Sequence, residues 1–166
     1  MDLLDSGSRR NFASGAVRDC NDDKGRCDLL PLEIIGKFTN DNILTHIGKY
    51  VYDGDTAHLW GAIDEFSRTR YGDSPAGMYT ALLEISKQYA DGARKYSDRN
   101  WEKGMPLHCY IDSGTRHYIK FLRGDSDEPH DRAFMWNLLG AIWTQKNHPN
   151  LIDLPFGEGG NNASEN

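Results

Sequence analysis

Ionisable and aromatic side chains alternate along the segment from Arg99 to Asn137. Within it, Asp112 and Arg116 are four residues apart, so a helix would place them on one face. A carboxylate there can hold a divalent cation or activate water, and an arginine can bind phosphate oxygens. His117 follows about a third of a turn further round the same helix. On these residues alone, an ordinary ion pair on the helix surface is the simpler interpretation.

A second group of candidates lies where the next helix is expected to begin. Asp127, Glu128 and Asp131 are typical of a helix start, because carboxylates stabilise the positive end of a helix. They could instead join Asp112 in holding Mg²⁺ or Mn²⁺ through oxygen ligands. The candidate catalytic residues are therefore Asp112, His117, Glu128 and His130. The candidate metal ligands are Asp112, Asp127, Glu128 and Asp131.

The same helix is expected to bury one polar residue. His130 and Asn137 are seven residues apart and share a face with Phe134 on a mostly apolar helix. Asn137 is therefore expected in or near the core, where its amide needs a partner from the backbone or from a polar pocket. The dipeptide His130-Asp131, together with His117 and His108, also permits a His–Asp metal phosphohydrolase, but a dipeptide is a weak signal.

Groups that could bind a nucleotide occur in two further places. A loop expected at residues 97–106 carries two cations and a tryptophan that can stack on a base, and three of the cations in the N-terminal arm are further candidates. A loop pinned by its tryptophan, and a flexible arm with scattered charge, are the plainer interpretations. The candidate nucleotide-binding residues are Arg18, Lys24, Arg26, Arg99, Asn100, Trp101, Lys103, Arg116 and Asn137.

Composition limits the classes of protein that the chain can represent. It has 166 residues, 38% of them hydrophobic, and a formal net charge of -6, which is typical of one globular domain and unfavourable for general nucleic-acid binding. Neither a membrane-length apolar run nor the apolar core of a signal peptide occurs, so a cytoplasmic protein is expected. Three cysteines then indicate reduced thiols. A zinc site from Cys20, Cys27, His108 and Cys109 is conceivable, but its spacing is not specific.

Capping signals and helical periodicity predict an all-α fold. Asp41, Asp55 and Ser74 are candidate N-caps, and the last of them precedes a proline. Helices are expected at residues 32–38, 42–52, 56–71, 76–96, 107–122 and about 127–145, with no period-two strand pattern. In the fourth, an apolar stripe (Leu82, Ile85, Tyr89, Ala93, Tyr96) adjoins a polar one (Glu84, Gln88, Asp91, Lys95). The chain thus divides into an irregular arm (1–27), a single-domain helical bundle (28–147) and a flexible tail (148–166).

Several motifs in order resemble one phage and prophage domain family. They are GAVRD, DKGRCDLLP, YADGARKYSDRNWEKGMP, DSGTRHYIKFLRGDSDEPH and AFMWNLL. The family is described as the N-terminal part of dATP/dGTP diphosphohydrolases. The resemblance covers residues from about Phe12 to Pro31 and from about Leu82 to Trp143, and residues 38–81 look like an insertion relative to shorter members.

The resemblance implies an activity and an assembly. It suggests a link to the MazG-like pyrophosphohydrolases, helical bundles that form dimers or larger homo-oligomers. These use Mg²⁺ held by Glu and Asp to hydrolyse nucleoside triphosphates. The expected function is therefore metal-dependent cleavage of dATP or dGTP to monophosphate and pyrophosphate, in the host cytoplasm if the chain is phage-encoded. The paired ExxE and ExxD motifs of the MazG-like group are not found here. The alternatives are a non-catalytic phage protein that sequesters a nucleotide or nucleotide-derived signal, and a domain that only scaffolds a partner.

Overall fold

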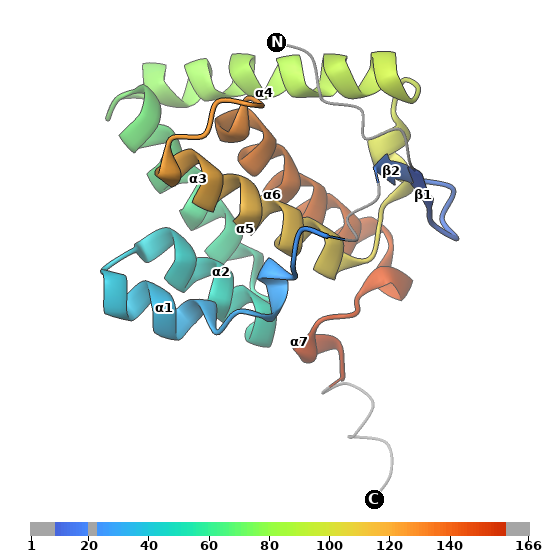
Figure 1. Cartoon of the computed structure of the whole chain (residues 1–166), viewed down its shortest axis with the longest axis horizontal. Helices are drawn as coiled ribbons and strands as arrows, with labels where there is room; N and C mark the ends of the chain where they lie inside the picture. Colours follow the sequence, from blue (N-terminus) through green and yellow to red (C-terminus); the bar gives the residue numbers. More distant parts are fainter. Residues whose placement is uncertain (1–8, 20–22, 159–166) are drawn as a thin grey trace, which may run out of the picture.

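The computed structural model describes residues 9–19 and 23–158, and it confirms the predicted all-α class. The described residues form seven α-helices, three short 3₁₀ helices and one small hairpin (Figure 1). The α-helices are α1 (Leu32–Thr39), α2 (Asn42–Asp53), α3 (Thr56–Tyr71), α4 (Pro75–Lys95), α5 (Leu107–Arg123), α6 (His130–Asn147) and α7 (Pro155–Glu158). The 3₁₀ helices are η1 (Cys27–Leu29), η2 (Asn100–Lys103) and η3 (Pro149–Leu151). No described helix has the length and apolar character needed to cross a membrane.

Local capping explains where several helices begin and end. The Asp41 carboxylate accepts a hydrogen bond from the Leu44 amide at 2.9 Å, and that of Asp55 accepts one from the Ala57 amide at the same distance. Both caps were predicted. Ser74 differs, because its side chain makes no capping hydrogen bond and α4 begins instead with a proline at its first turn. The α5 helix ends at Gly124, whose φ of 86° favours glycine.

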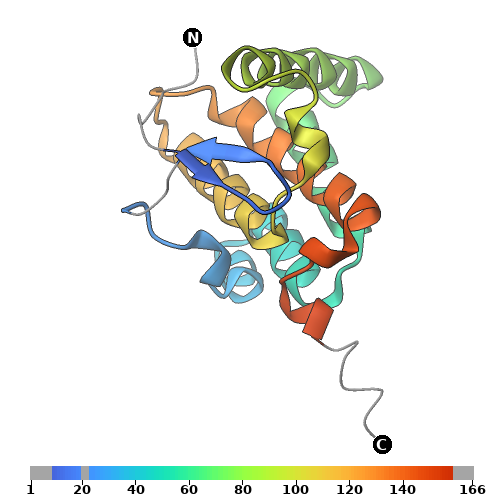
Figure 2. The same cartoon turned by 90° about the vertical axis from the view of Figure 1, so that its right-hand side faces the viewer.

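The N-terminal arm contains structure that the sequence pattern did not predict. Strands β1 (Arg9–Asn11) and β2 (Val17–Asp19) pair as an antiparallel hairpin, with Arg10 opposite Arg18. Three residues per strand are too few to show an alternating pattern. Figure 2 shows the hairpin lying across α5, far from it in the sequence. The arm therefore supplies one wall of the structure around α5.

The described part of the expected flexible tail, residues 148–158, has regular structure. It forms η3 and α7, and Leu154 is buried. Phe156 packs edge-on against Tyr50 of α2, with ring centroids 5.6 Å apart. These two apolar side chains thus attach the segment to the bundle. The prediction missed this because the sequence that follows is rich in glycine.

The core lies around the two central helices, α5 and α6, which run side by side in Figure 1. Ile111, Phe134 and Leu138 are fully buried, and Phe66 of α3 packs on Phe134 with ring centroids 4.9 Å apart. Close approach of the helices requires Gly140, because a Cβ there would overlap the ring of Tyr110. The α5–α6 pair is therefore the scaffold on which the other elements are placed.

The inward face of α4 combines part of the predicted apolar stripe with part of the predicted polar stripe. Ile85 is buried, as expected. Leu82, expected in the apolar stripe, is half-exposed, whereas Gln88 and Asp91 of the expected polar stripe are buried. Asp91 accepts a hydrogen bond from Arg132 of α6 at 2.8 Å and also pairs with Arg94. A buried ion pair across α4 and α6 thus overrides the hydrophobic pattern of α4 alone.

Candidate functional site

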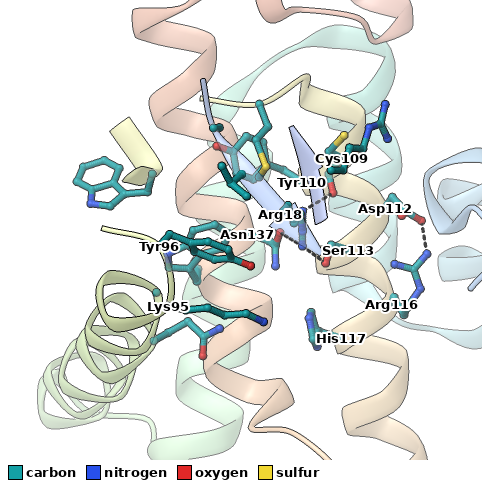
Figure 3. Close-up of a pocket in the computed structure, with 18 of the residues that line it drawn as sticks. Arg18, Lys95, Tyr96, Cys109, Tyr110, Asp112, Ser113, Arg116, His117 and Asn137 are labelled. Carbon is teal, nitrogen blue, oxygen red and sulfur yellow. Dashed lines mark hydrogen bonds and ion pairs between the residues drawn. The ribbon is translucent and has the colours of Figure 1, made fainter. Parts of the chain in front are cut away.

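A cavity of about 1470 Å³ opens between the hairpin, η1, the end of α4, η2, α5 and α6. Figure 3 shows Arg18 of β2 between Ser113 of α5 and Asn137 of α6, while Lys95 and Tyr96 reach in from the end of α4. Segments far apart in the sequence therefore meet around one space. Its volume is ample for a ligand of nucleotide size.

Positive charge is concentrated in this cavity. Its lining contains nine Lys or Arg residues and four Asp or Glu residues among those that the structure describes. The whole chain has a formal net charge of -6, so the cavity has the opposite sign of charge from the protein. A cavity lined by one sign of charge attracts ligands of the other sign. The arrangement is suited to an anion.

Arg18 occupies the centre of the lining and has neutral partners. Its guanidinium donates to the Cys109 carbonyl oxygen at 3.2 Å, to the Asn137 amide oxygen at 3.3 Å, and to the Ser113 hydroxyl. No described carboxylate forms an ion pair with it. Burial lowers the pKa of Arg18, but a guanidinium stays protonated at neutral pH. The protein thus holds a positive charge in place without neutralising it.

Asn137 explains how Arg18 is oriented. Its side chain is 1% exposed and donates to the Ala133 carbonyl oxygen at 2.8 Å, so its amide oxygen is left to accept from Arg18. The predicted core position of Asn137 is confirmed. Of the two expected partners, backbone and pocket, this amide uses both.

Asp112 and Arg116 form the predicted ion pair, but their surroundings are those of a structural link. Asp112 is 4% exposed and accepts from Arg116 at 2.6 Å and from the Cys27 amide at 2.7 Å. Arg116 also donates to the Gly25 carbonyl oxygen at 2.8 Å. Together they attach the segment before α1 to α5, so that Lys24 and Arg26 line the cavity.

A chain of hydrogen-bonded side chains lies further along the same wall. The Nδ1 atoms of His117 and His130 are 2.9 Å apart, and Nε2 of His130 lies 2.8 Å from Oδ1 of Asp127. Glu128 Oε2 is 3.8 Å from His117 Nδ1. Burial, with nearby cations including Arg18, lowers the pKa of His117 to about 3, so this ring is neutral at pH 7. Hydrogen bonds from Lys120 and His130 lower the pKa of Asp127.

Another part of the cavity lining is aromatic. The Tyr89 ring lies 5.4 Å from that of Trp101 and 6.2 Å from that of Trp136, measured between centroids. Gln88 also lines the cavity, and its buried Oε1 has no hydrogen-bond partner among the described residues. Flat side chains beside an unsatisfied acceptor are suited to a heterocycle that carries N–H groups.

Most of the candidates from sequence line this one cavity. They are Arg18, Lys24, Arg26, Arg99, Asn100, Trp101, Asp112, Arg116, His117, Asp127, Glu128 and Asn137. Lys103 is exposed and outside the lining, and His130 lies behind His117. Sequence reasoning missed Gln88, Lys95, Tyr96, Ser113 and Lys120. Ser113 and Lys120 neighbour candidates on α5, and this could have drawn attention to them, but nothing in the pattern marked the end of α4.

The four carboxylates proposed as metal ligands are divided between different partners. Asp112 is held by Arg116, and Asp131 faces away to Arg70 at 3.3 Å and Tyr71 at 3.2 Å. Asp127 pairs with Lys120 at 2.8 Å. Among the described residues, the sets of three possible ligands within reach of one ion all include a histidine. The described residues do not support the conceivable zinc site either. Cys27 and Cys109 are free thiols, and Cys20 lies outside the described residues.

Comparison with known proteins identifies one relationship. A family model described as dATP/dGTP diphosphohydrolase, N-terminal, matches residues 67–153. The match contains α4, α5 and α6 and most of the cavity lining, including the second of the two segments on which the resemblance rested, Leu82 to Trp143. The first segment, Phe12 to Pro31, lies outside the match, and residues 67–81, expected as part of an insertion, lie within it. No curated protein and no solved structure matches the chain.

Proposed function

The chain belongs to the dATP/dGTP diphosphohydrolase N-terminal family, and we propose that its cavity binds a purine deoxynucleoside triphosphate and hydrolyses it to monophosphate and pyrophosphate. In this reaction the oxygen of water bonds to the α-phosphorus. The bond from that phosphorus to the bridging oxygen breaks, and pyrophosphate leaves with that oxygen while the water releases a proton. A cavity of about 1470 Å³ accommodates the whole substrate.

The observation that carries this proposal is Arg18 and its neutral partners. Arg18 is half-buried and forms no ion pair with a described carboxylate, so an anion that binds its guanidinium would supply the missing opposite charge. Its hydrogen bonds to Cys109, Ser113 and Asn137 fix its position and leave its charge uncompensated. Phosphate oxygens match the planar fork of an arginine. Arg18 is therefore the proposed contact for the triphosphate, with the surrounding Lys and Arg residues extending the anion-binding surface.

The aromatic part of the cavity lining is the proposed site for the base. Tyr89, Trp101 and Trp136 offer ring faces and edges within one cluster, and stacking on such rings suits any base. Gln88 supplies an acceptor with no described partner, and an amino or ring N–H group of a purine would satisfy it. Base and triphosphate would then contact different parts of the lining, with the sugar between them.

The expected Mg²⁺ does not fit the carboxylates proposed for it. Mg²⁺ requires oxygen ligands in near-octahedral geometry, whereas Asp112 and Asp131 are held by arginines in different parts of the structure. No step of the reaction is therefore assigned to an ion held by those four residues. This division favours a second candidate function, in which the domain holds a nucleotide, or a signal derived from one, without cleaving it.

A nucleotide panel with an Arg18→Gln variant tests the proposal. The purified protein is incubated with each deoxynucleoside triphosphate and a divalent cation, and free products and bound ligand are identified by mass spectrometry. Deoxynucleoside monophosphate with pyrophosphate supports the hydrolase, whereas a ligand recovered intact from the protein supports sequestration. If neither a product nor a bound nucleotide is detected, both candidate functions are overturned.

The variant connects either outcome to the cavity. Arg18→Gln keeps hydrogen-bonding capacity toward Ser113 and Asn137 but removes the charge, and we expect nucleotide affinity to fall about 10- to 150-fold. The control is Arg68→Gln, because Arg68 is exposed on α3 and pairs with Asp64 at 3.0 Å outside the cavity. Equal affinities for the two variants would show that the nucleotide binds elsewhere. Thermal unfolding of both verifies that they are folded.

A further inference from the structure

Two imidazoles and one carboxylate converge on the cavity wall at the junction of α5 and α6. We propose that His117, Glu128 and His130 form a binding site for a first-row transition-metal dication. Each offers one ligand atom, and these atoms all lie within 4.8 Å of one another. His117 and Glu128 line the cavity, and His130 stands behind them, 2% exposed. A bound ion would thus be held from one side and open to the cavity on the other.

The distances between the ligand atoms suit a single ion. Metal–nitrogen and metal–oxygen bonds of about 2.1 Å allow two ligands of one ion to be at most about 4.2 Å apart. The two imidazole Nδ1 atoms are 2.9 Å apart, and Glu128 Oε2 is 3.8 Å from His117 Nδ1. The first separation corresponds to an angle of roughly 90° at the ion, which octahedral sites use. An ion therefore fits among these atoms with small side-chain adjustments.

Asp127 orients the ligand that lies deepest. Its carboxylate accepts from Nε2–H of His130 at 2.8 Å, which leaves Nδ1 of that ring, facing His117, to offer a lone pair. Metal-binding histidines are commonly oriented by a carboxylate in this way. In the metal-free protein, the Nδ1 proton of His117 lies between the two rings. When an ion binds, that proton moves to Nε2 of His117 and both Nδ1 lone pairs become ligands.

A competing cluster on the same histidine is less suitable. Asp125 and Asp127 could join His130 around an ion on its Nε2 side. However, Asp125 is held by Arg123 at 2.7 Å and Asp127 by Lys120 at 2.8 Å. Glu128 differs, because among the described residues it pairs with no Lys or Arg, and its ion-pair contact is with His117 at 3.8 Å. An ion held by His117, Glu128 and His130 takes the place of the proton between the two rings. An ion held by Asp125, Asp127 and His130 would have to displace Arg123 and Lys120 from their carboxylates.

Ligand chemistry indicates which ions bind. Two nitrogens and one carboxylate suit Mn²⁺, Fe²⁺, Co²⁺ or Zn²⁺, whereas Mg²⁺ prefers oxygen ligands only. Metal binding at this site does not depend on the proposed function. The role given to the ion does rest on that function, since an ion beside Arg18 could polarise a phosphoryl oxygen of the bound nucleotide. The metal assay therefore contains no nucleotide, so that either proposal can fail alone.

The experiment measures metal content after equilibration with Zn²⁺ or Co²⁺. Chelator-treated full-length protein is dialysed against each ion, and against Mg²⁺ in a parallel sample, and bound metal is counted by mass spectrometry. We expect about one Zn²⁺ or Co²⁺ per chain and no retained Mg²⁺. Bound Co²⁺ should also produce visible ligand-field absorption that is altered in Glu128→Gln, where an amide replaces the carboxylate.

Matched histidine variants locate the ion. His117→Gln should lose it, with at least a tenfold weaker affinity. His46→Gln should retain it, because His46 belongs to a similar pair (Nδ1 atoms of His46 and His58 3.1 Å apart) outside the cavity. Circular dichroism of the same samples shows whether each variant is folded. Metal content unchanged by both His117→Gln and Glu128→Gln would indicate an adventitious ion only and overturn the proposal, as would wild-type protein without metal.

Discussion

Two histidine pairs in the molecule have the same pattern of hydrogen bonds and different surroundings. In each, two Nδ1 atoms face one another across neighbouring helices, and Nε2 of the second ring contacts a carboxylate. The residues are His117, His130 and Asp127 on one side, with distances of 2.9 and 2.8 Å, and His46, His58 and Asp53 on the other, with distances of 3.1 and 2.9 Å. Geometry within the pair therefore does not distinguish them.

What lies around each pair does distinguish them. The His130 side chain is 1% exposed and that of His58 is 21% exposed. Glu128 adds a third ligand atom to the first pair, whereas the second is in no described set of three possible ligands. The first also borders the cationic cavity. A histidine pair thus becomes a candidate site only through a third ligand and access to a cavity.

Removing the carboxylate that contacts each histidine pair should give the largest difference in metal affinity between the two pairs. In Asp127→Ala, His130 loses the acceptor that fixes its tautomer, and we expect the affinity for Zn²⁺ to fall about 10- to 100-fold. Asp53→Ala removes the corresponding carboxylate from His58 and should leave that affinity unchanged. Metal titration of the three proteins measures the difference. Similar losses in both variants would mean that the two pairs are equivalent, contrary to the comparison.

Glycine contacts between the helices that carry the two pairs provide the next largest difference. A Cβ at Gly140 would overlap the Tyr110 ring, which is 1% exposed and cannot move aside, so Gly140→Ala should lower the free energy of unfolding by about 1–2 kcal/mol. A Cβ at Gly61 would be 3.2 Å from the ring of His46, a partly exposed side chain that can rotate.

The expected result for Gly61→Ala is therefore a stability equal to or above that of the wild type, because alanine favours the helix by up to about 1 kcal/mol. Urea unfolding of both variants measures the two values. A greater loss from Gly61→Ala than from Gly140→Ala would show that the α2–α3 contact is packed more rigidly than the α5–α6 contact. Gly140→Ala should also weaken metal binding, since it moves apart the helices that carry His117 and His130.

The helices could be predicted from the sequence because the residues that begin and end each helix act locally. Asp41 and Asp55 act within one turn of their own helix, and the structure confirms both as N-caps. Gly124, which ends α5, also acts within one turn. The burial of Asn137 could also be predicted, since only apolar residues surround it along α6. These features depend on spacing along one element.

Features that depend on two elements could not be predicted in the same way. Gln88 and Asp91 looked exposed until α6 supplied Arg132 as a partner for Asp91. Asp131 looked like a companion of Asp127, yet the α6 helix turns it toward Arg70. The partnership of His117 and Glu128 needs both α5 and the start of α6. Distances across helices, rather than residue types, determine which candidates meet.

A third histidine–carboxylate contact sharpens the comparison, because it has no second imidazole. His108 at the start of α5 is hydrogen-bonded to Asp153, and this bond is the main cause that raises the pKa of His108 to about 10. Burial lowers the pKa of His117 to about 3. Burial would raise the pKa of Asp153, but its hydrogen bonds with His108 outweigh this and lower it. His108, hydrogen-bonded to a carboxylate, is therefore charged at pH 7, whereas His117, buried beside a second imidazole in a cationic wall, is neutral.

The sign of the resulting pH dependence follows from the raised pKa. An unfolded histidine has a pKa of about 6.5, so the stabilisation by protonated His108 is complete below that pH and is lost as the pH rises toward about 10. Since Asp153 is partly exposed, the contact should contribute no more than about 1 kcal/mol. Asp153→Asn should therefore lower the unfolding temperature at pH 6 and have little effect at pH 10.6. Asp64→Asn is the control, because its exposed partner is Arg68, which stays charged across this range. An equal effect of Asp153→Asn at both pH values would mean that its contribution comes from the hydrogen bond to the His108 amide, 2.9 Å long, and not from the charge on the ring.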